Sequence, residues 1–231
     1  MKRLGIVGGT APDSTIEYYR LIVASYRDRT RDGSYPSLLI NSIDLKTMLD
    51  LIGADRLADL TRFLLDEVGH LARAGAEFGL LASNTPHIVF DDLEQRSPIP
   101  LISIVEAACD AAQALGLKKV GLIGTRFTMQ GRFYPDVFSR RGIALCVPAP
   151  EDQAYIHKKY MGELVNGVFR PDVRDELLAI VDRLKQKDDI QGVILGGTEL
   201  PIALGSQGDR DIPFLDTTRI HVERAVARMF S

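Results

Sequence analysis

Short apolar runs alternate along the chain with longer stretches in which apolar residues recur every three or four positions. The short runs predict strands over residues 4–7, 37–43, 78–82, 101–104, 120–123, 143–147, 192–195 and 213–215. The longer stretches predict helices over residues 14–27, 56–74, 103–115, 172–185 and 217–229. Strands that alternate with helices are typical of βαβ units, in which a helix returns the chain to a parallel neighbour. We therefore expect an α/β fold with mostly parallel sheets.

Two strand-to-turn segments recur at nearly the same separation along the chain. Residues 4–10 are similar to residues 120–125, and residues 82–85 are similar to residues 196–199. Either match alone has little weight, but two matches at one offset indicate an internal duplication. The sequence therefore predicts two pseudo-symmetric, Rossmann-like parallel-sheet halves.

The duplication also predicts where the halves begin and end. The first half is expected over residues 1–98, joined by a returning C-terminal segment 208–231, and the second half over residues 99–207. Prolines within residues 96–100 interrupt regular structure and favour a crossing point there. Because ligands of open α/β sheets bind beyond the carboxyl ends of the strands, we expect the active-site cleft between the two halves.

Composition and charge exclude several classes of protein. The chain has 231 residues, of which 45% are hydrophobic and 26% charged, as in ordinary globular domains. A formal net charge of −3 provides no basic surface for nucleic acid or anionic lipid. No apolar run approaches the roughly 20 residues that span a bilayer. We expect no nucleic-acid partner, no membrane partner and, by elimination, a cytoplasmic location.

Neither the cysteines nor the histidines form a metal-binding or disulfide pattern. Cys109 and Cys146 are the two cysteines, and they show no CxxC spacing. The four histidines are scattered, without an HExxH motif. The glycine-rich turns match neither the dinucleotide fingerprint nor the P-loop. We expect no metal, no nucleotide cofactor and no structural disulfide.

The turn after the first predicted strand is a candidate anion site. Gly9 and Thr10 lie between that strand and the start of a helix, where backbone N–H groups favour a carboxylate or phosphate. The alternative is an ordinary tight turn in which Asp13 or Ser14 caps the helix. The letters alone leave both interpretations open.

A second candidate segment follows the strand predicted at residues 78–82. Ser83, Asn84 and Thr85 carry small hydroxyl and amide side chains that can hold a carboxylate, although Asn84 or Thr85 could equally cap a helix. His87 is a candidate general acid or base, because an unperturbed imidazole titrates near neutrality. The alternative for His87 is that it only orients or caps a neighbour.

The second half carries two similar segments. Thr198 and Glu199 follow a strand and the bare Gly197, and Glu199 is either a base, an amine ligand or a partner for a helix dipole. Thr125 and Arg126 follow another strand, and the Arg126 guanidinium either pairs with a carboxylate or faces water.

Taken together, these motifs resemble the aspartate/glutamate racemase family, and the acidic amino-acid branch is the most similar. The resemblance covers essentially the whole chain and is carried by Gly8-Gly9, Ser83-Asn84-Thr85, Gly124-Thr125-Arg126-Phe127-Thr128, Pro150-Glu151-Asp152, Ile156-His157, Glu163-Leu164, Gly196-Gly197-Thr198-Glu199, Phe214-Leu215-Asp216-Thr217 and Ile220-His221. It implies a cofactor-independent homodimeric isomerase. It also implies that a small acidic amino acid is bound by Gly9, Thr10, Asn84, Thr85, Thr125, Thr198 and Glu199, with Arg126 as the candidate cation.

The chain departs from the family pattern at the two positions that carry the chemistry. Family members that racemise acidic amino acids carry a cysteine at each of the positions that are Ser83 and Gly197 in this sequence. One thiol removes the α-proton and the other returns a proton to the opposite face, and a serine hydroxyl is a far weaker acid. We therefore expect two-thiol racemisation to be abolished or much reduced.

Two further hypotheses about function follow from the absence of these cysteines. The chain could be a cysteine-independent decarboxylase, lyase or isomerase of a small carboxylate on the same scaffold, with His87, Glu199 or an activated Ser83 as its base. It could also be a non-catalytic homologue that binds a carboxylate.

Overall fold

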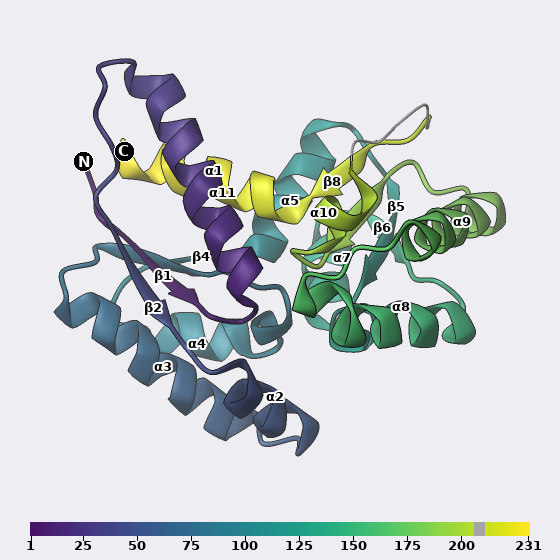
Figure 1. Cartoon of the computed structure of the whole chain (residues 1–231), viewed down its shortest axis with the longest axis horizontal. Coiled ribbons are helices and arrows are strands. Elements are labelled where there is room, and N and C mark those ends of the chain that lie inside the picture. The colour runs from purple at the N-terminus through teal and green to yellow at the C-terminus, as the bar shows by residue number, and fades with distance from the viewer. Residues whose placement is uncertain (206–210) are drawn as a thin grey trace. The chain divides into compact units, whose positions relative to one another are not determined.

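The computed structural model describes residues 1–205 and 211–231 and divides into two compact units (Figure 1). The first unit comprises Met1–Ile104 and His221–Ser231, and the second comprises Val105–Ile220. Each unit holds a four-stranded parallel sheet with flanking helices. The α/β class predicted from the alternating pattern is confirmed.

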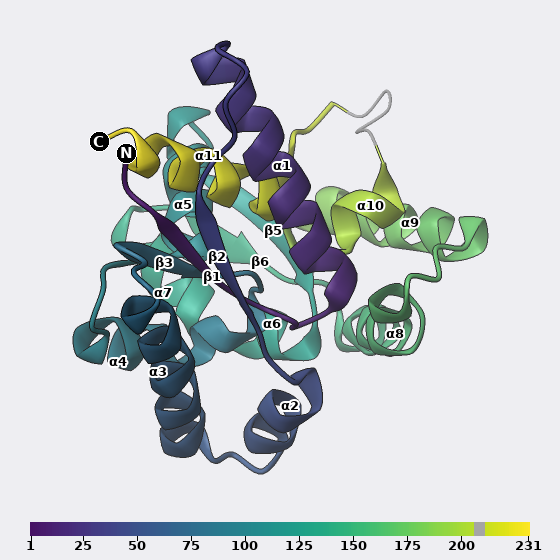
Figure 2. The same ribbon diagram turned by 60° about the vertical axis from the view of Figure 1, so that its left-hand side comes forward.

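The sheet of the first unit has the order β2-β1-β3-β4. Its strands are β1 (Leu4–Gly8), β2 (Leu38–Ser42), β3 (Phe78–Leu81) and β4 (Leu101–Ile102). Its helices are α1 (Pro12–Thr30), α2 (Leu45–Gly53), α3 (Leu57–Arg73), the 3-10 helix η1 (Thr85–Val89), α4 (Phe90–Arg96) and most of α11 (Thr217–Met229). Helices α1 and α11 cover one face of the sheet, and α3 and α4 lie on the other (Figures 1 and 2).

Residue spacing explains why the helices of the first unit pack on its sheet. In α3, Leu60, Leu64, Val68 and Leu71 recur at three- and four-residue steps and are all buried. Every residue of β1 is buried as well, as expected of a central parallel strand that is covered on both faces. The helix predicted over residues 56–74 is therefore confirmed almost to its ends.

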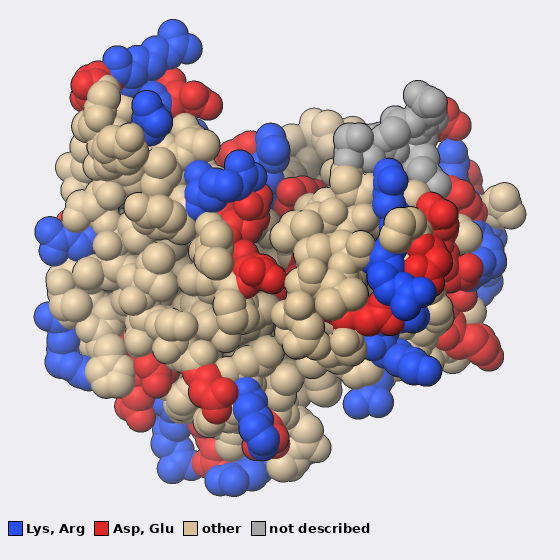
Figure 3. Space-filling view, viewed as in Figure 1, with Lys and Arg blue, Asp and Glu red and all other residues tan. Residues whose placement is uncertain are grey.

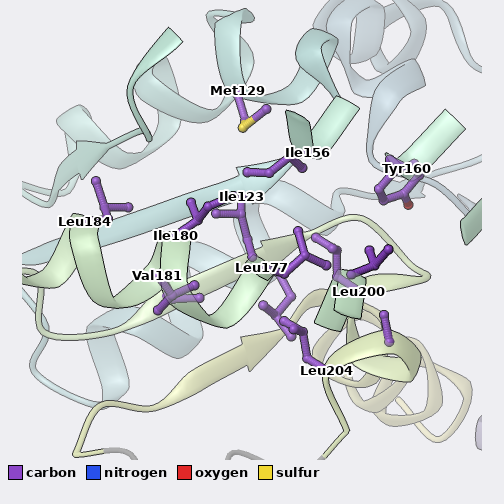
Figure 4. Packing of buried hydrophobic residues seen from close by; sticks show 14 of the residues in the cluster. Ile123, Met129, Ile156, Tyr160, Leu177, Ile180, Val181, Leu184, Leu200 and Leu204 are labelled. Carbon is purple, nitrogen blue, oxygen red and sulfur yellow. The ribbon is translucent and has the colours of Figure 1, made fainter. Parts of the chain in front are cut away.

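The second unit repeats this topology, with the strand order β6-β5-β7-β8. Its strands are β5 (Lys119–Gly124), β6 (Ala144–Cys146), β7 (Val193–Gly196) and β8 (Phe214–Asp216). Its helices are α5 (Ile104–Ala114), α6 (Arg126–Gln130), α7 (Phe133–Arg140), α8 (Pro150–Gly162), the 3-10 helix η2 (Leu164–Asn166), α9 (Pro171–Asp188) and α10 (Leu200–Leu204). Buried residues of α8 and α9, such as Ile156, Leu177 and Ile180, pack with Ile123 of β5 in one apolar cluster (Figure 4).

Strands β4 and β8 do not belong to the sheets in which they were predicted. β4 pairs with β3 and so completes the first sheet, although residues 99–207 were expected to form the second half. β8 pairs with β7 and so completes the second sheet, although residues 208–231 were expected to return to the first half. In each sheet the fourth strand follows the third along the chain and pairs with it, and only the helix after it begins the change of unit. The predicted boundary at residues 207 and 208 itself lies outside the described residues.

Charge and hydropathy of the folded chain follow the composition. Lysine and arginine are interspersed with aspartate and glutamate on the face shown in Figure 3, without one dominant sign. Across the described ranges 1–205 and 211–231, no helix combines the length and apolar character that a bilayer crossing requires.

Candidate functional site

The first candidate site, which we call the first strand-end site, comprises Gly9, Thr10, Ser83, Asn84 and Thr85. It exists because β1 and β3 are parallel neighbours, with Val7 in register with Leu81. The turns that follow the two strands therefore meet at one edge of the sheet. Thr10 is 8% exposed and its hydroxyl donates to the Ala82 carbonyl at 3.3 Å, which joins the two turns directly.

The turn after β1 requires glycine at position 9. Gly9 has a φ of +80°, and a Cβ there would lie 2.3 Å from the Ile43 carbonyl oxygen. The Gly9 N–H donates to the Thr15 hydroxyl at 2.8 Å, so this amide is engaged within the turn. Capping by Asp13 or Ser14 is not what begins the helix, because α1 starts at Pro12 and its N-cap residue makes no side-chain capping bond.

Asn84 and Thr85 lie at the start of the 3-10 helix η1. Asn84 is 2% exposed and Thr85 is 6% exposed, while Ser83 is half-buried. Asn84 occupies the N-cap position, but its side chain makes no capping bond there. The helix-cap alternative is therefore not what the Asn84 side chain does here.

His87 has a structural role in this arrangement, and the expectation that it titrates near neutrality is wrong. The ring is 1% exposed, Nδ1–H donates to the Ser83 carbonyl at 3.0 Å, and Nε2 accepts the Ile104 N–H at 3.1 Å. Burial first, and then the nearby His221, lower the pKa of His87 to about 3. Both nitrogens of this neutral imidazole are thus hydrogen-bonded to backbone groups, and the ring positions Ser83.

A second buried histidine supports the same region. His221 is fully buried, accepts the Tyr18 hydroxyl at Nδ1 over 2.8 Å, and donates from Nε2 to the Ile102 carbonyl at 2.9 Å. Burial lowers the pKa of His221 to about 4. The His87 and His221 rings lie 6.4 Å apart, edge to face. Together they form a neutral histidine pair behind the first strand-end site.

The second strand-end site comprises Thr125, Arg126, Gly197, Thr198 and Glu199. It forms in the same way, because β5 and β7 are parallel neighbours in register at Gly124 and Gly196. The approach there is close: a Cβ on Gly124 would lie 2.5 Å from the Gly196 carbonyl oxygen. Thr125 caps α6 by accepting the Thr128 N–H at 3.3 Å.

Arg126 faces solvent, and its guanidinium lies 5.6 Å from the centre of the Phe127 ring. Its backbone N–H donates to Nδ1 of His157 at 3.2 Å. Burial and the Arg126 charge lower the pKa of His157. The structure therefore adds His157 to this segment, and the Arg126 guanidinium has the exposure that a ligand-pairing cation needs.

Tyr160 completes the second strand-end site. Its hydroxyl donates to Oε2 of Glu199, and the Thr198 hydroxyl donates to the same oxygen at 3.0 Å. Glu199 is 1% exposed and Tyr160 is 5% exposed. Burial and the neighbouring Glu199 charge raise the pKa of Tyr160 well above its ordinary value, so the phenol stays protonated.

Tyr160 also occupies the space next to Gly197. A Cβ built on Gly197 would lie 2.5 Å from Cε2, 2.6 Å from the hydroxyl oxygen and 2.8 Å from Cζ of Tyr160. Sequence reasoning missed Tyr160 because α8, which carries it, was not among the predicted helices. No local signal connects the tyrosine to a glycine at the end of a distant strand.

Comparison with known proteins assigns the chain to a family. The sequence profile of the Asp/Glu/Hydantoin racemases matches residues 7–225. The chain belongs to this family.

Related proteins match over nearly the full length. A broad specificity amino-acid racemase of Bacillus subtilis (strain 168) is 25% identical over 229 residues, covering 93% of this chain and 92% of that protein. An aspartate racemase homologue from Pyrococcus horikoshii OT3 is 32% identical, with a TM-score of 0.86 and 100% coverage of both chains. The structure of a candidate Asp/Glu racemase from Yersinia pestis is 30% identical, with a TM-score of 0.90 and the same coverage.

Within this racemase family, the chain keeps its only two cysteines outside the strand-end sites. Cys109 lies in α5, and Cys146 ends β6. Burial raises the pKa of both thiols, which makes them less reactive. Among residues 1–205 and 211–231, no three His, Cys, Asp or Glu side chains are grouped so as to hold a metal ion.

Proposed function

We propose that this racemase-family chain binds a small acidic amino acid or related dicarboxylate and acts at its α-carbon, without a two-thiol mechanism. The observation that carries the proposal is the collection of nearly buried hydroxyl and amide side chains at the carboxyl ends of adjacent parallel strands in each unit. These side chains are Thr10, Asn84, Thr85, Thr125 and Thr198.

Ligand chemistry supports the substrate class. Hydroxyl and amide side chains gathered at strand ends are suited to hydrogen bonding with the polar groups of an amino acid. Arg126 is the exposed cation on the same segment as Thr125. The names of relatives support the amino-acid class, since one is a broad specificity amino-acid racemase and another an aspartate racemase homologue.

The residues at the two family cysteine positions limit which groups can transfer a proton at the α-carbon. Racemisation needs a base on one face of the α-carbon and an acid on the other. Ser83 offers only a weakly acidic hydroxyl, and Gly197 offers no side chain. We therefore propose that efficient racemisation through two thiols is absent, and that any proton transfer uses oxygen groups.

A one-face proton-transfer enzyme is the second candidate function. It is favoured by the buried contact between Tyr160 and Glu199 beside Gly197. A purely binding protein would not need a buried phenol and carboxylate in hydrogen-bond contact at that place.

Truncating the polar side chains that are proposed to contact the ligand should weaken binding without unfolding the chain. We expect Asn84→Ala and Thr198→Ala each to raise the Kd for L-aspartate or L-glutamate by roughly 10- to 100-fold, the range for a hydrogen bond to a charged group. Isothermal titration calorimetry measures the Kd, and circular dichroism checks the fold. Ser139→Ala, an exposed hydroxyl deletion on α7, should leave the Kd unchanged.

Two outcomes would contradict the proposal in different ways. Wild-type binding that survives both Asn84→Ala and Thr198→Ala would place the ligand elsewhere. Absence of wild-type binding to aspartate, glutamate and succinate would remove the acidic substrate class altogether.

A further inference from the structure

We propose that the Tyr160 hydroxyl and the Glu199 carboxylate form a proton-transfer pair in the place of the thiol at position 197, and exchange the substrate α-proton on one face with retention of configuration. This inference rests on the proposed function, because it takes the same small acidic amino acid as substrate. It goes further by assigning the proton carrier and the stereochemical outcome.

The Tyr160 phenol occupies the space that a side chain at position 197 would fill. A thiol at position 197 would be attached to a Cβ, and the Tyr160 hydroxyl oxygen lies 2.6 Å from where that Cβ would stand. The phenol and a side chain at 197 therefore exclude each other sterically. In this chain the side chain that fills the space beside residue 197 ends in a phenol, which carries an exchangeable proton.

The Tyr160 phenol is hydrogen-bonded to a carboxylate. The Tyr160 hydroxyl donates to Oε2 of Glu199, so a proton that leaves Tyr160 has an acceptor already in hydrogen-bond contact. Thr198 donates to the same carboxylate oxygen at 3.0 Å and holds it in place. Because Glu199 is 1% exposed, water does not screen this interaction.

The resting protonation state agrees with this assignment. Burial and the neighbouring Glu199 charge keep the phenol protonated at neutral pH. Tyr160 alone is therefore not a base, and it can accept a proton only as it passes its own to Glu199. The two residues must act together, which is the arrangement that their hydrogen bond provides.

The step balances without any further reactant. The Cα–H bond of the substrate breaks, and its electron pair stays on the substrate, delocalised into the adjacent carboxylate. The proton moves to the Tyr160 oxygen, while the proton of the phenol moves to Glu199. The reverse transfer returns a proton from Tyr160 to the same face. In deuterated water, exchange of the Tyr160 hydroxyl proton with solvent while the carbanion persists places a deuteron on the phenol, and the reverse transfer returns that deuteron to the α-carbon.

Retention of configuration follows because the same phenol removes the proton and returns it. Ser83, the residue at the other family position, carries only a hydroxyl, which is a far weaker acid than a thiol. The exchanged amino acid therefore keeps its hand, in contrast to the product of a two-thiol racemase.

The test compares α-proton exchange, chirality and binding in four proteins. Wild type, Tyr160→Phe, Glu199→Gln and Tyr155→Phe are incubated in deuterated water with each enantiomer of aspartate and glutamate. Proton NMR follows the α-proton, chiral chromatography follows the enantiomer, and calorimetry gives the Kd. Tyr155 is the matched control, because it is a half-buried tyrosine on the same helix, α8.

We expect wild type and Tyr155→Phe to exchange the α-proton of one enantiomer without racemising it. Tyr160→Phe keeps the ring beside Gly197, and Glu199→Gln keeps a hydrogen-bonding side chain. Both should slow exchange at least about 100-fold, the usual contribution of a general acid or base. The Kd should change little in Tyr160→Phe, which separates loss of proton transfer from loss of binding.

Any other outcome overturns a specific part of the proposal. Unchanged exchange in Tyr160→Phe, exchange with racemisation, or a wild type that binds but exchanges no α-proton would each overturn the proton-transfer pair while leaving the binding function standing. A wild type that binds none of the four amino acids would overturn the proposed substrate class, and the pair with it.

Discussion

Lowering the pH from about 8 to about 5 is expected to remove about 4 kcal/mol from the free energy of unfolding through two buried histidines. His87 and His221 have folded-state pKa values of about 3 and about 4, whereas an imidazole in the unfolded chain titrates at 6.5. Between these values the unfolded chain binds protons that the folded chain does not. Stability is therefore complete above pH 6.5 and is lost progressively as the pH falls.

Urea unfolding at several pH values between about 8 and about 5 measures this loss, since most carboxyl groups stay ionised over that range. The slope should reach at least about two protons taken up per molecule unfolded, because His87 and His221 each contribute and the lowered pKa of His157 adds to them. His70→Gln is the control, because it removes an imidazole whose side chain is 57% exposed. Stability that is flat over this range, or His87 and His221 resonances that titrate near 6.5 in NMR, would contradict the buried neutral pair.

Adding a single methyl group at position 197 is expected to destabilise the protein by about 3 kcal/mol, the upper range for overpacking. In Gly197→Ala the new Cβ would lie 2.5 Å from the Tyr160 ring, and the ring is buried and bonded to Glu199. Tyr160 must move, which breaks its hydrogen bond to Glu199. The buried Glu199 carboxylate then lacks one of its hydrogen-bond donors, which is unfavourable.

A double-mutant cycle separates this collision from a general intolerance of position 197. In a Tyr160→Leu background, Gly197→Ala should cost less than about 1 kcal/mol, because the ring that it meets has gone. Gly162→Ala, on the same helix as Tyr160, meets nothing within 4 Å and should be neutral or slightly stabilising. Equal costs of Gly197→Ala in both backgrounds, measured by denaturant unfolding, would show that Tyr160 is not the obstacle. The same collision implies that a thiol returned to position 197 needs a smaller residue at position 160.

Much of the fold follows from local patterns. Each of the eight predicted strands is present, and α3 buries the leucine face that its spacing predicts. The duplicated strand order of the two sheets also agrees with the repeated motifs. Strand and helix periodicity depends on near neighbours, so it can be recognised without the tertiary structure. The pairing of β4 and β8 could not be recognised in that way, because a strand's partner lies far along the chain.

The candidate site likewise has features that short motifs predict and features that only packing determines. Ser83, Thr198 and Glu199 stand in motifs a few residues long, and the family resemblance that these motifs carry is confirmed by the family profile. His87 was a candidate acid or base because the sequence does not reveal that both of its ring nitrogens are bonded to backbone groups. Burial and hydrogen bonding set its pKa, and both arise only from packing.

The amino-acid sequence by itself therefore determined the α/β class, the duplicated strand pattern, the family and the loss of both family cysteines. The tertiary structure decided which groups meet at the strand ends. Tyr160 lies 39 positions from Glu199 along the chain, yet its hydroxyl bonds to that carboxylate and its ring fills the space beside Gly197. Such contacts depend on how a helix packs against a sheet, because side chains distant in sequence become neighbours only when the chain folds.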